Sequence, residues 1–223
     1  MNPKQLAGEK STEFIQSGMK IGLGTGSTAY FMVKKVGEMV RGGLEILATA
    51  TSKATEDLAR SEGIPLVGLK ELDKLDLTID GADEFTDDLQ LIKGGGGALY
   101  REKVVASISK ELIIITDPRK YVEKLGAFTL PVEVVPFGSE ITQRRIEALG
   151  GKVNIRKIEG QLFKTDNGNL IFDCDFGLID DPKVLDKQLK LLLGVVETGL
   201  FIDMATKVIM AQPDGTLKTW EKS

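Results

Sequence analysis

Apolar segments of two kinds alternate along the first two-thirds of the chain. Short apolar runs have the length of buried strands, and the segments between them carry apolar residues at every third or fourth position, the spacing of a helix. One such segment begins after Ser52 and ends before Gly63, residue types that begin and end helices. Alternating strands and helices favour right-handed crossovers, so this part is predicted to be a doubly wound α/β domain with a mainly parallel sheet. The predicted strands are residues 19–24, 44–50, 64–69, 75–80 and 111–116.

The pattern changes after about residue 128. From "PVEVV" to "VVETGLFI" the segments are typical of strand, helix, strand, strand, helix and strand, the order of a ferredoxin-like split βαβ module. "TDNGN" has the composition of a hairpin turn between the middle strands. The closing "TKVIMAQ" and "TLKTW", joined by a "PDG" turn, are predicted strands that return to the first domain. We therefore predict one domain from residues 1–128 and 206–223, and a smaller α+β domain from residues 129–205.

The composition is that of a globular protein. Hydrophobic residues make up 42% and charged residues 28% of the chain, which argues against long disordered regions. No apolar run approaches the roughly 20 residues of a membrane span, and the N-terminal stretch is polar where a signal peptide has its apolar core. The single Cys174 cannot form an intrachain disulfide and is expected to be a buried structural residue. These features predict a cytoplasmic protein.

Charge and residue usage exclude several classes of function. The net charge of −4, from 29 basic and 33 acidic residues, provides no overall basic surface for nucleic acid. The chain has no histidine, which excludes Ser-His-Asp and Cys-His mechanisms and most zinc sites. Proton transfers in an enzyme of this composition must use carboxylates, lysine, tyrosine or water.

The stretch "GLGTGST", residues 22–28, follows a predicted strand and opens a predicted helix. Amides at such a turn bind anions together with the helix N-terminus, and Ser27 and Thr28 add hydroxyl groups. The stretch lacks the third glycine and the distant acidic residue of a dinucleotide site, and it lacks the lysine of a nucleotide P-loop. A small phosphorylated ligand is therefore favoured, although a turn needed only for packing would have a similar composition.

Polar residues also follow the next strands of the predicted sheet. "DGADEF" places Asp80 at the carboxyl end of a buried strand, the edge at which ligands bind in open α/β sheets. Convergence of Asp80, Asp83 and Glu84 would raise the pKa of at least one of them. The same stretch is compatible with a magnesium site, or with a solvated acidic turn formed at Gly81. "DPRK" places Lys120 near the same edge, where a helix that starts with proline is the simpler explanation.

"LIKGGGGALYREK", residues 91–103, contains four consecutive glycines. Such a run is kept where the backbone takes left-handed angles or where something approaches it closely. Lys93 precedes the glycines, and Glu102 lies early in the helix predicted after them. A carboxylate base and fixed positive charge beside exposed amides are what enolisation needs. Arg101 and Lys103 are better explained as surface charges of that helix.

Five segments taken in order resemble the ribose-5-phosphate isomerase A family: "GLGTGSTA", "DGADE", "KGGGGALYREK", "LPVEVVP" and "TDNGN". The resemblance extends along nearly the whole chain. It implies interconversion of ribose 5-phosphate and ribulose 5-phosphate in the non-oxidative pentose phosphate pathway, with no metal or organic cofactor. It also implies a Rossmann-like domain with a smaller α+β domain, and a homodimer or a dimer of dimers.

The resemblance also implies roles for individual residues. Glu102 would be the general base that moves a proton between C2 and C1 through a cis-enediolate, and Lys93 with nearby amides would stabilise the negative oxygen. Asp80 would help to open the sugar ring, and Asp83 would shuttle protons between the two oxygens. The implied substrate-binding residues are Lys4, Thr25, Gly26, Ser27, Thr28, Asp80, Gly81, Ala82, Asp83, Lys93, Gly94, Gly95, Gly96 and Lys120.

Two other classes of function remain open at this point. A non-catalytic sugar-phosphate sensor would keep the phosphate loop and would need neither a base nor the paired lysine. A nucleotide-dependent oxidoreductase or transferase would use the "GLGTG" loop, and the missing acidic residue after the second strand argues against it.

Overall fold

The computed structural model describes residues 2–222 and divides the chain into two compact units. The first unit comprises Met1–Ala82, Arg101–Tyr121 and Met204–Ser223, and the second comprises Asp83–Tyr100 and Val122–Asp203. The segment 83–100, with the glycine run, thus belongs to the second unit. The domain borders expected from the sequence stay a prediction, because compactness alone does not show which parts fold by themselves.

A six-stranded sheet forms the centre of the first unit, in the order β15-β14-β6-β3-β1-β2. All neighbouring pairs are parallel except β14 and β15, which are antiparallel. The mainly parallel, doubly wound sheet is confirmed, as is the return of the last two strands to it. The bounds are β1 Lys20–Leu23, β2 Leu47–Ala50, β3 Leu75–Asp80, β6 Ser109–Thr116, β14 Lys207–Ala211 and β15 Leu217–Glu221.

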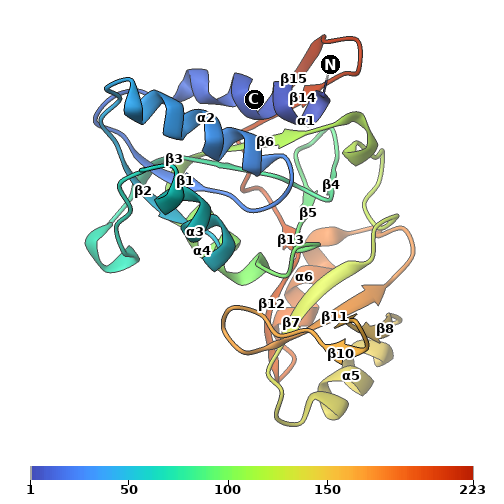
Figure 1. Ribbon diagram of the computed structural model, residues 1–223. Helices are drawn as coiled ribbons and strands as arrows, with labels where there is room; N and C mark the ends of the chain where they lie inside the picture. Colours follow the sequence, from blue (N-terminus) through green and yellow to red (C-terminus); the bar gives the residue numbers. More distant parts are fainter. Residues whose placement is uncertain (1, 223) are drawn as a thin grey trace. The chain divides into compact units, whose positions relative to one another are not determined.

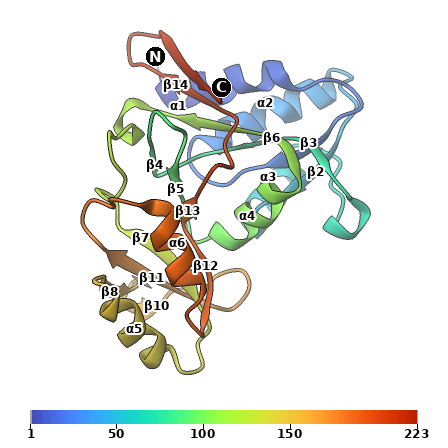
Figure 2. The ribbon, with the colours of Figure 1, turned by 180° about the vertical axis from the view of Figure 1, so that it is seen from behind.

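Helices cover both faces of this sheet. The helices around the sheet can be followed in Figures 1 and 2. Apolar residues of α1, α2 and α3 pack on one face with Ile21 and Leu23 of β1, whereas Val105 of α4 lies on the other face, against Gly22. The caps of α3 are as predicted, because Ser52 Oγ accepts the amide of Thr55 at 3.1 Å and Gly63 follows the helix with a φ of +75°. The bounds are α1 Pro3–Ser11, α2 Ala29–Arg41, α3 Lys53–Ser61 and α4 Leu99–Ser107, with short 3-10 helices at Thr12–Phe14, Leu69–Glu71 and Pro118–Lys120.

The strand predicted at residues 64–69 is wrong. Leu66 makes only an isolated parallel bridge to Ala48, beside β2 at the edge of the sheet. Ala48 donates its amide to the carbonyl of Pro65 and accepts the amide of Val67, both at 2.9 Å. Pro65 has no amide to donate, so the ladder cannot extend from Leu66 towards Ile64.

The second unit contains a four-stranded antiparallel sheet in the order β12-β7-β11-β8. With α5 and α6 between the strands, this is the order of the predicted ferredoxin-like module. The hairpin β9–β10 lies between β8 and β11, so the "TDNGN" turn follows this hairpin instead of joining the middle strands directly. The bounds are β7 Leu130–Val134, α5 Ser139–Ala148, β8 Lys152–Ile155, β9 Lys157–Ile158, β10 Gln161–Leu162, β11 Leu170–Asp175, α6 Pro182–Lys190 and β12 Val195–Thr198.

A small antiparallel sheet, β13-β5-β4, frames the glycine run within the second unit. Its strands are β4 Glu84–Phe85, β5 Leu91–Ile92 and β13 Leu200–Phe201. The predicted strand "VVETGLFI" is therefore two strands, β12 and β13, separated by Gly199. The amide of Gly199 binds the carbonyl of Pro131 at 2.7 Å and its own carbonyl accepts the amide of Lys93 at 2.8 Å, which links β7 to the residue just before the glycine run.

Each unit has its own apolar core. In the first unit, apolar residues of α1, α2 and α3 pack against the six-stranded sheet, and in the second, α5 and α6 pack against the four-stranded sheet. Cys174 is a free, buried thiol within the second core, as predicted. Among residues 2–222, no helix is both long and apolar enough to cross a membrane.

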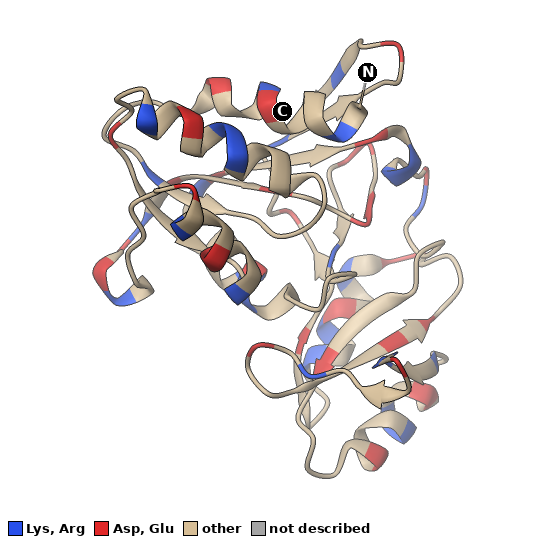
Figure 3. Ribbon diagram, in the orientation of Figure 1, with Lys and Arg blue, Asp and Glu red and all other residues tan. Residues whose placement is uncertain are grey.

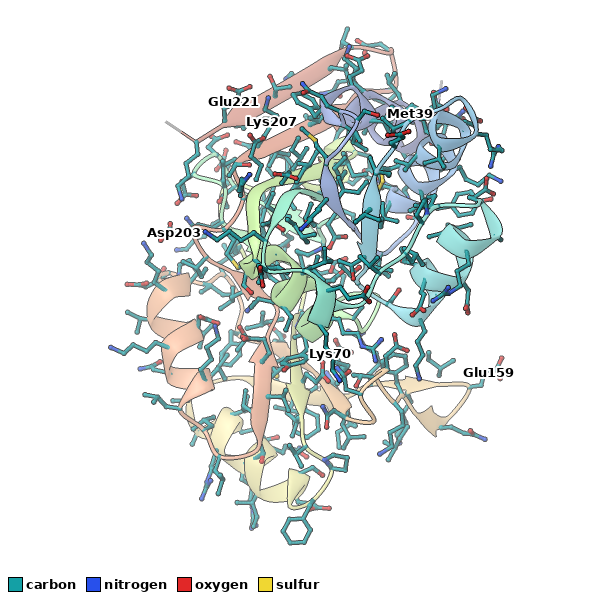
Figure 4. All side chains as sticks on the ribbon, turned by 90° about the vertical axis from the view of Figure 1, so that its left-hand side faces the viewer. Met39, Lys70, Glu159, Asp203, Lys207 and Glu221 are labelled. Atoms are coloured by element: carbon teal, nitrogen blue, oxygen red, sulfur yellow. The ribbon has the colours of Figure 1, made fainter. Side chains whose placement is uncertain are left out.

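Charged residues of both signs occur along α2 and α3 (Figure 3). Glu62, which follows α3, accepts bonds from both Lys34 and Arg41 of α2, and this pairing lowers the pKa of its carboxyl. Lys207 and Glu221 lie side by side on β14 and β15, with Nζ 3.0 Å from Oε1 (Figure 4).

Candidate active site

The loop between β1 and α2 has the form of an anion-binding turn. Gly26 has a φ of +120°, an angle that side chains rarely adopt, and its carbonyl accepts the amide of Tyr30 at 2.9 Å to begin α2. Thr28 stands at the N-cap without a side-chain capping bond, and Ser27 is exposed. The positive end of the α2 dipole is thus presented at this loop together with its hydroxyl groups.

Lys4 lies at the same loop. Its Nζ donates a 2.7 Å hydrogen bond to Ser27 Oγ, across 23 residues of sequence. The contact arises because α1 packs beside α2, with Gly8 so close to α2 that a Cβ atom on it would lie 2.9 Å from the amide nitrogen of Met32. A lysine that the sequence placed only by resemblance is therefore next to the predicted phosphate loop.

A cluster of hydroxyl groups holds the other end of the loop. Thr25 Oγ1 lies 2.7 Å from Thr51 Oγ1, 2.8 Å from Ser52 Oγ and 3.0 Å from Thr55 Oγ1. Thr55 also donates to the carbonyl of Gly24 at 3.1 Å. Sequence reasoning missed this cluster, although three hydroxyl residues after the second predicted strand were a readable signal.

Asp80 ties the end of β3 to the same loop. Its Oδ1 accepts the amide of Thr25 at 2.9 Å and that of Gly81 at 2.8 Å, and the residue is almost completely buried. A Cβ atom on Gly24 would lie 2.2 Å from Oδ1, so this carboxylate requires glycine at position 24. Asp80 therefore shapes the loop, whatever further part it has in chemistry.

The three crowded carboxylates are held by different groups of amides. Asp83 Oδ2 accepts the amide of Gly95 at 2.7 Å, whereas Glu84 accepts those of Gly126 and Phe128. The pKa of Glu84 is raised, chiefly by burial and to a smaller extent by the charge of Asp83. In the part of the chain that the structure describes, no group of three or more His, Cys, Asp or Glu side chains has the arrangement of a metal site.

At three positions of the run, the backbone angle or a close neighbour leaves no room for a side chain. Gly94 and Gly97 have φ of +102° and +78°. A Cβ atom on Gly95 would lie 2.5 Å from Asp83 Oδ1, and one on Gly97 would lie 2.4 Å from the ring of Phe163. The amide of Gly97 binds the carbonyl of Gly94 at 2.9 Å and closes the loop into a turn.

Charged side chains flank the run on both sides and are buried. Lys93 is 2% exposed, with Nζ 5.4 Å from the centre of the Phe201 ring, within the range of a cation–π contact. Glu102 lies in the first turn of α4 and is 5% exposed. Lys103 is buried too, so its interpretation as a surface charge is wrong, while Arg101 is only partly buried. Lys120 ends the 3-10 helix after β6 and is partly exposed, as are Gly81 and Ala82.

Comparison with known proteins decides the family. The model of "Ribose 5-phosphate isomerase A (phosphoriboisomerase A)" matches residues 47–215. The chain is 55% identical over 216 residues to ribose-5-phosphate isomerase A of Bacillus mycoides, covering 96% of this chain and 98% of that relative. The chain belongs to the ribose-5-phosphate isomerase A family.

Solved structures of the isomerase family agree with this. Ribose 5-phosphate isomerase from Plasmodium falciparum superposes with a TM-score of 0.96 at 38% identity, covering 99% of this chain and 98% of that one. A D-ribose-5-phosphate isomerase in complex with phospho-erythronic acid superposes with a TM-score of 0.95 at 35% identity, covering 99% and 100%. The bonds Lys4–Ser27, Thr25–Asp80 and Asp83–Gly95 bring predicted site residues of this family member together in pairs, and their catalytic roles stay predictions.

Proposed function

We propose that this chain interconverts ribose 5-phosphate and ribulose 5-phosphate through a cis-enediolate, with Glu102 as the base. The observation that carries the proposal is the burial of Glu102 in the first turn of the helix that follows the glycine run, in a chain of this family. A carboxylate shielded from water keeps the proton it takes from carbon and can return it to the neighbouring carbon.

The phosphate group would bind at the loop of residues 25–28. The α2 N-terminus, the hydroxyl of Ser27 and the ammonium of Lys4 supply positive potential and donors, and their preformed geometry supports this assignment. Lys120 would add a second positive charge. Binding energy at the non-reacting phosphate positions the carbon atoms at the other end of the sugar.

The chemistry would take place on the open-chain sugar. Asp80 would help to move the proton of the ring oxygen, after which Glu102 takes the proton from C2 and returns it to C1. Lys93 and the amides of Gly94 and Gly96 would stabilise the negative oxygen, an effect worth roughly 3–4 kcal/mol per donor. The amide of Gly95 would hold Asp83 beside the sugar. Asp83 would carry the hydroxyl proton between the two oxygens, so that no atom is gained or lost.

The test is to mix purified protein with ribose 5-phosphate in buffer containing EDTA and to follow ribulose 5-phosphate by its ketose absorbance. Conversion is expected, and Glu102→Gln should lower kcat by about 100-fold or more while inorganic phosphate still binds. The control is Glu147→Gln on α5, where the exposed carboxylate pairs with Gln143. Full kcat in Glu102→Gln would show that another residue is the base.

The same assay separates the isomerase from a sugar-phosphate sensor. A folded protein that binds ribose 5-phosphate without converting it would support the sensor. Family membership and the buried base favour the enzyme, because a sensor has no use for a carboxylate at this position.

We also propose that the chain assembles as a homodimer or a dimer of dimers. Large apolar side chains of the second unit are strongly exposed in the single chain, with Phe137 at 94%, Leu193 at 80% and Leu191 at 77%. Light scattering after gel filtration measures the mass, and a monomer at micromolar concentration would contradict the proposal. The cytoplasmic location stays a prediction from the sequence.

A further inference from the structure

Arg156, between β8 and β9, binds the backbone of the glycine run. Its Nη1 donates to the carbonyl oxygens of Gly94 and Gly95, each at 3.0 Å. Its Nε donates to Asp173 Oδ2 at 2.9 Å, and its Nη2 binds the other oxygen of the same carboxylate. A bidentate carboxylate therefore holds one edge of the guanidinium while the remaining nitrogen bridges two successive peptide groups.

These bonds orient two peptide planes of the run. In a trans peptide, the carbonyl of one residue and the amide of the next point in opposite directions, and residues 2–222 contain no cis peptide bond. The carbonyl of Gly94 points to Arg156, and the amide of Gly95 accordingly points the other way, to Asp83 Oδ2. By the same geometry the amide of Gly96 points away from the guanidinium. The positive charge beside the two carbonyls also polarises both peptides and makes their amides stronger donors.

A second contact comes from the chain just after the hairpin β9–β10. The ring of Phe163 occupies the space beside Gly97 that a Cβ atom would need, and the guanidinium carbon of Arg156 lies 5.8 Å from the ring centre. A backbone hydrogen bond also joins these two residues, because the amide of Phe163 donates to the carbonyl of Arg156 at 3.0 Å. Glu159, at the exposed tip of the hairpin, makes no part of this arrangement (Figure 4).

We propose that Arg156 is a positioning residue for the isomerase: it directs the amide of Gly95 to Asp83 and the amide of Gly96 to the oxygen that becomes negative in the enediolate. The proposal rests on the proposed function, since it assigns a task to those amides. It predicts a defect in stabilising the enediolate and none in holding the phosphate, because within residues 2–222 the guanidinium contacts the carbonyls of Gly94 and Gly95, Asp173 and the ring of Phe163, and none of the residues of the phosphate loop.

The test compares Arg156→Met and Arg156→Lys with Arg144→Met, a control at an exposed arginine on α5. The measured quantities are kcat, KM, the competition constant of inorganic phosphate, and that of phospho-erythronic acid, whose carboxylate imitates the oxygens of an enediolate. Arg156→Met should lower kcat 10- to 100-fold and weaken the binding of phospho-erythronic acid by a similar factor. The competition constant of inorganic phosphate should stay within about twofold of that of the parent protein. Arg156→Lys keeps the positive charge but lacks the planar guanidinium that binds Asp173 and both carbonyls at once, so it should recover only a small part of kcat.

Chemical rescue keeps the proposal testable if the variants are destabilised. Guanidinium ions at millimolar concentration should restore part of the activity of Arg156→Ala, and ammonium ions at equal concentration should not. The positioning role would be overturned if folded variants kept an unchanged kcat, or if they bound inorganic phosphate and phospho-erythronic acid more weakly by the same factor. Absence of conversion by the parent protein would instead contradict the proposed function, so the two failures are distinct.

Discussion

The ammonium group of Lys4 lies 2.7 Å from the hydroxyl of Ser27 and joins the first helix of the chain to the loop that begins the second. A phosphate group bound at this loop would replace a neutral hydroxyl as the main partner of the lysine. Charge-assisted hydrogen bonds are short and contribute more than neutral ones, so Lys4 should serve substrate binding.

Replacing Lys4 should therefore weaken substrate binding. For Lys4→Met we expect a roughly 10- to 100-fold higher KM for ribose 5-phosphate, since a hydrogen bond to a charged group contributes about 1.5–3 kcal/mol. Lys10→Met on the same helix is the matched control, because Lys10 pairs with exposed Glu13 and such pairs contribute about 0–1 kcal/mol. Steady-state kinetics of both variants measure the difference, and equal KM values would remove Lys4 from the site.

Two substitutions of Asp80 should have different effects. Asp80→Asn keeps an oxygen for the amides of Thr25 and Gly81, so KM should stay within about threefold while kcat falls at least tenfold through loss of the ionisable group. Asp80→Ala leaves both amides without this acceptor, and phosphate binding should weaken as well. Kinetics with competition by inorganic phosphate separate the two effects. Full kcat in Asp80→Asn would leave the residue with a purely structural task.

The stability of the fold should depend on Asp117 in acid. Arg119 holds the pKa of this buried carboxyl below its ordinary value, with Nε and Nη2 each 2.9 Å from a carboxylate oxygen. The unfolded chain then binds the proton more readily than the folded one, so the contribution to stability is complete above the ordinary pKa of about 3.9 and is lost as pH falls below it. Urea unfolding between pH 6 and pH 3 should show a shallower loss of stability for Arg119→Met than for Arg144→Met, and parallel curves would contradict the assignment.

Cys174 should be unreactive in the folded protein. The thiol is completely buried, and burial raises its pKa far above the ordinary value, so almost no thiolate is present at neutral pH. A thiol reagent at pH 8 should label one group per chain in denaturant and none within minutes under native conditions. Cys174→Ser should lower stability, because it buries a stronger hydrogen-bonding group in the same place. Rapid native labelling would show that the second core opens easily.

The sequence determined the features that depend on local pattern. Apolar spacing predicted the strands of the two larger sheets and the helices α2 to α6, but it did not predict α1, β4 or the hairpin β9–β10. Ser52 and Gly63 marked the ends of α3, and the glycine run marked a close approach before its neighbours were known. The strand predicted around Pro65 failed because apolar character alone does not reveal whether a neighbouring strand can continue the ladder.

The tertiary structure alone decided which residues meet. Lys4 reaches Ser27 across 23 residues, Asp80 reaches Thr25 across 55, and Arg156 reaches Gly94 across 62. Such partners follow from strand register and helix packing, which bring distant segments within hydrogen-bond distance and are not encoded in the spacing of any single segment. The sequence could therefore show that a carboxylate or an arginine was present, whereas only the fold assigned the carboxylate of Asp80 to the phosphate loop and the guanidinium of Arg156 to the glycines.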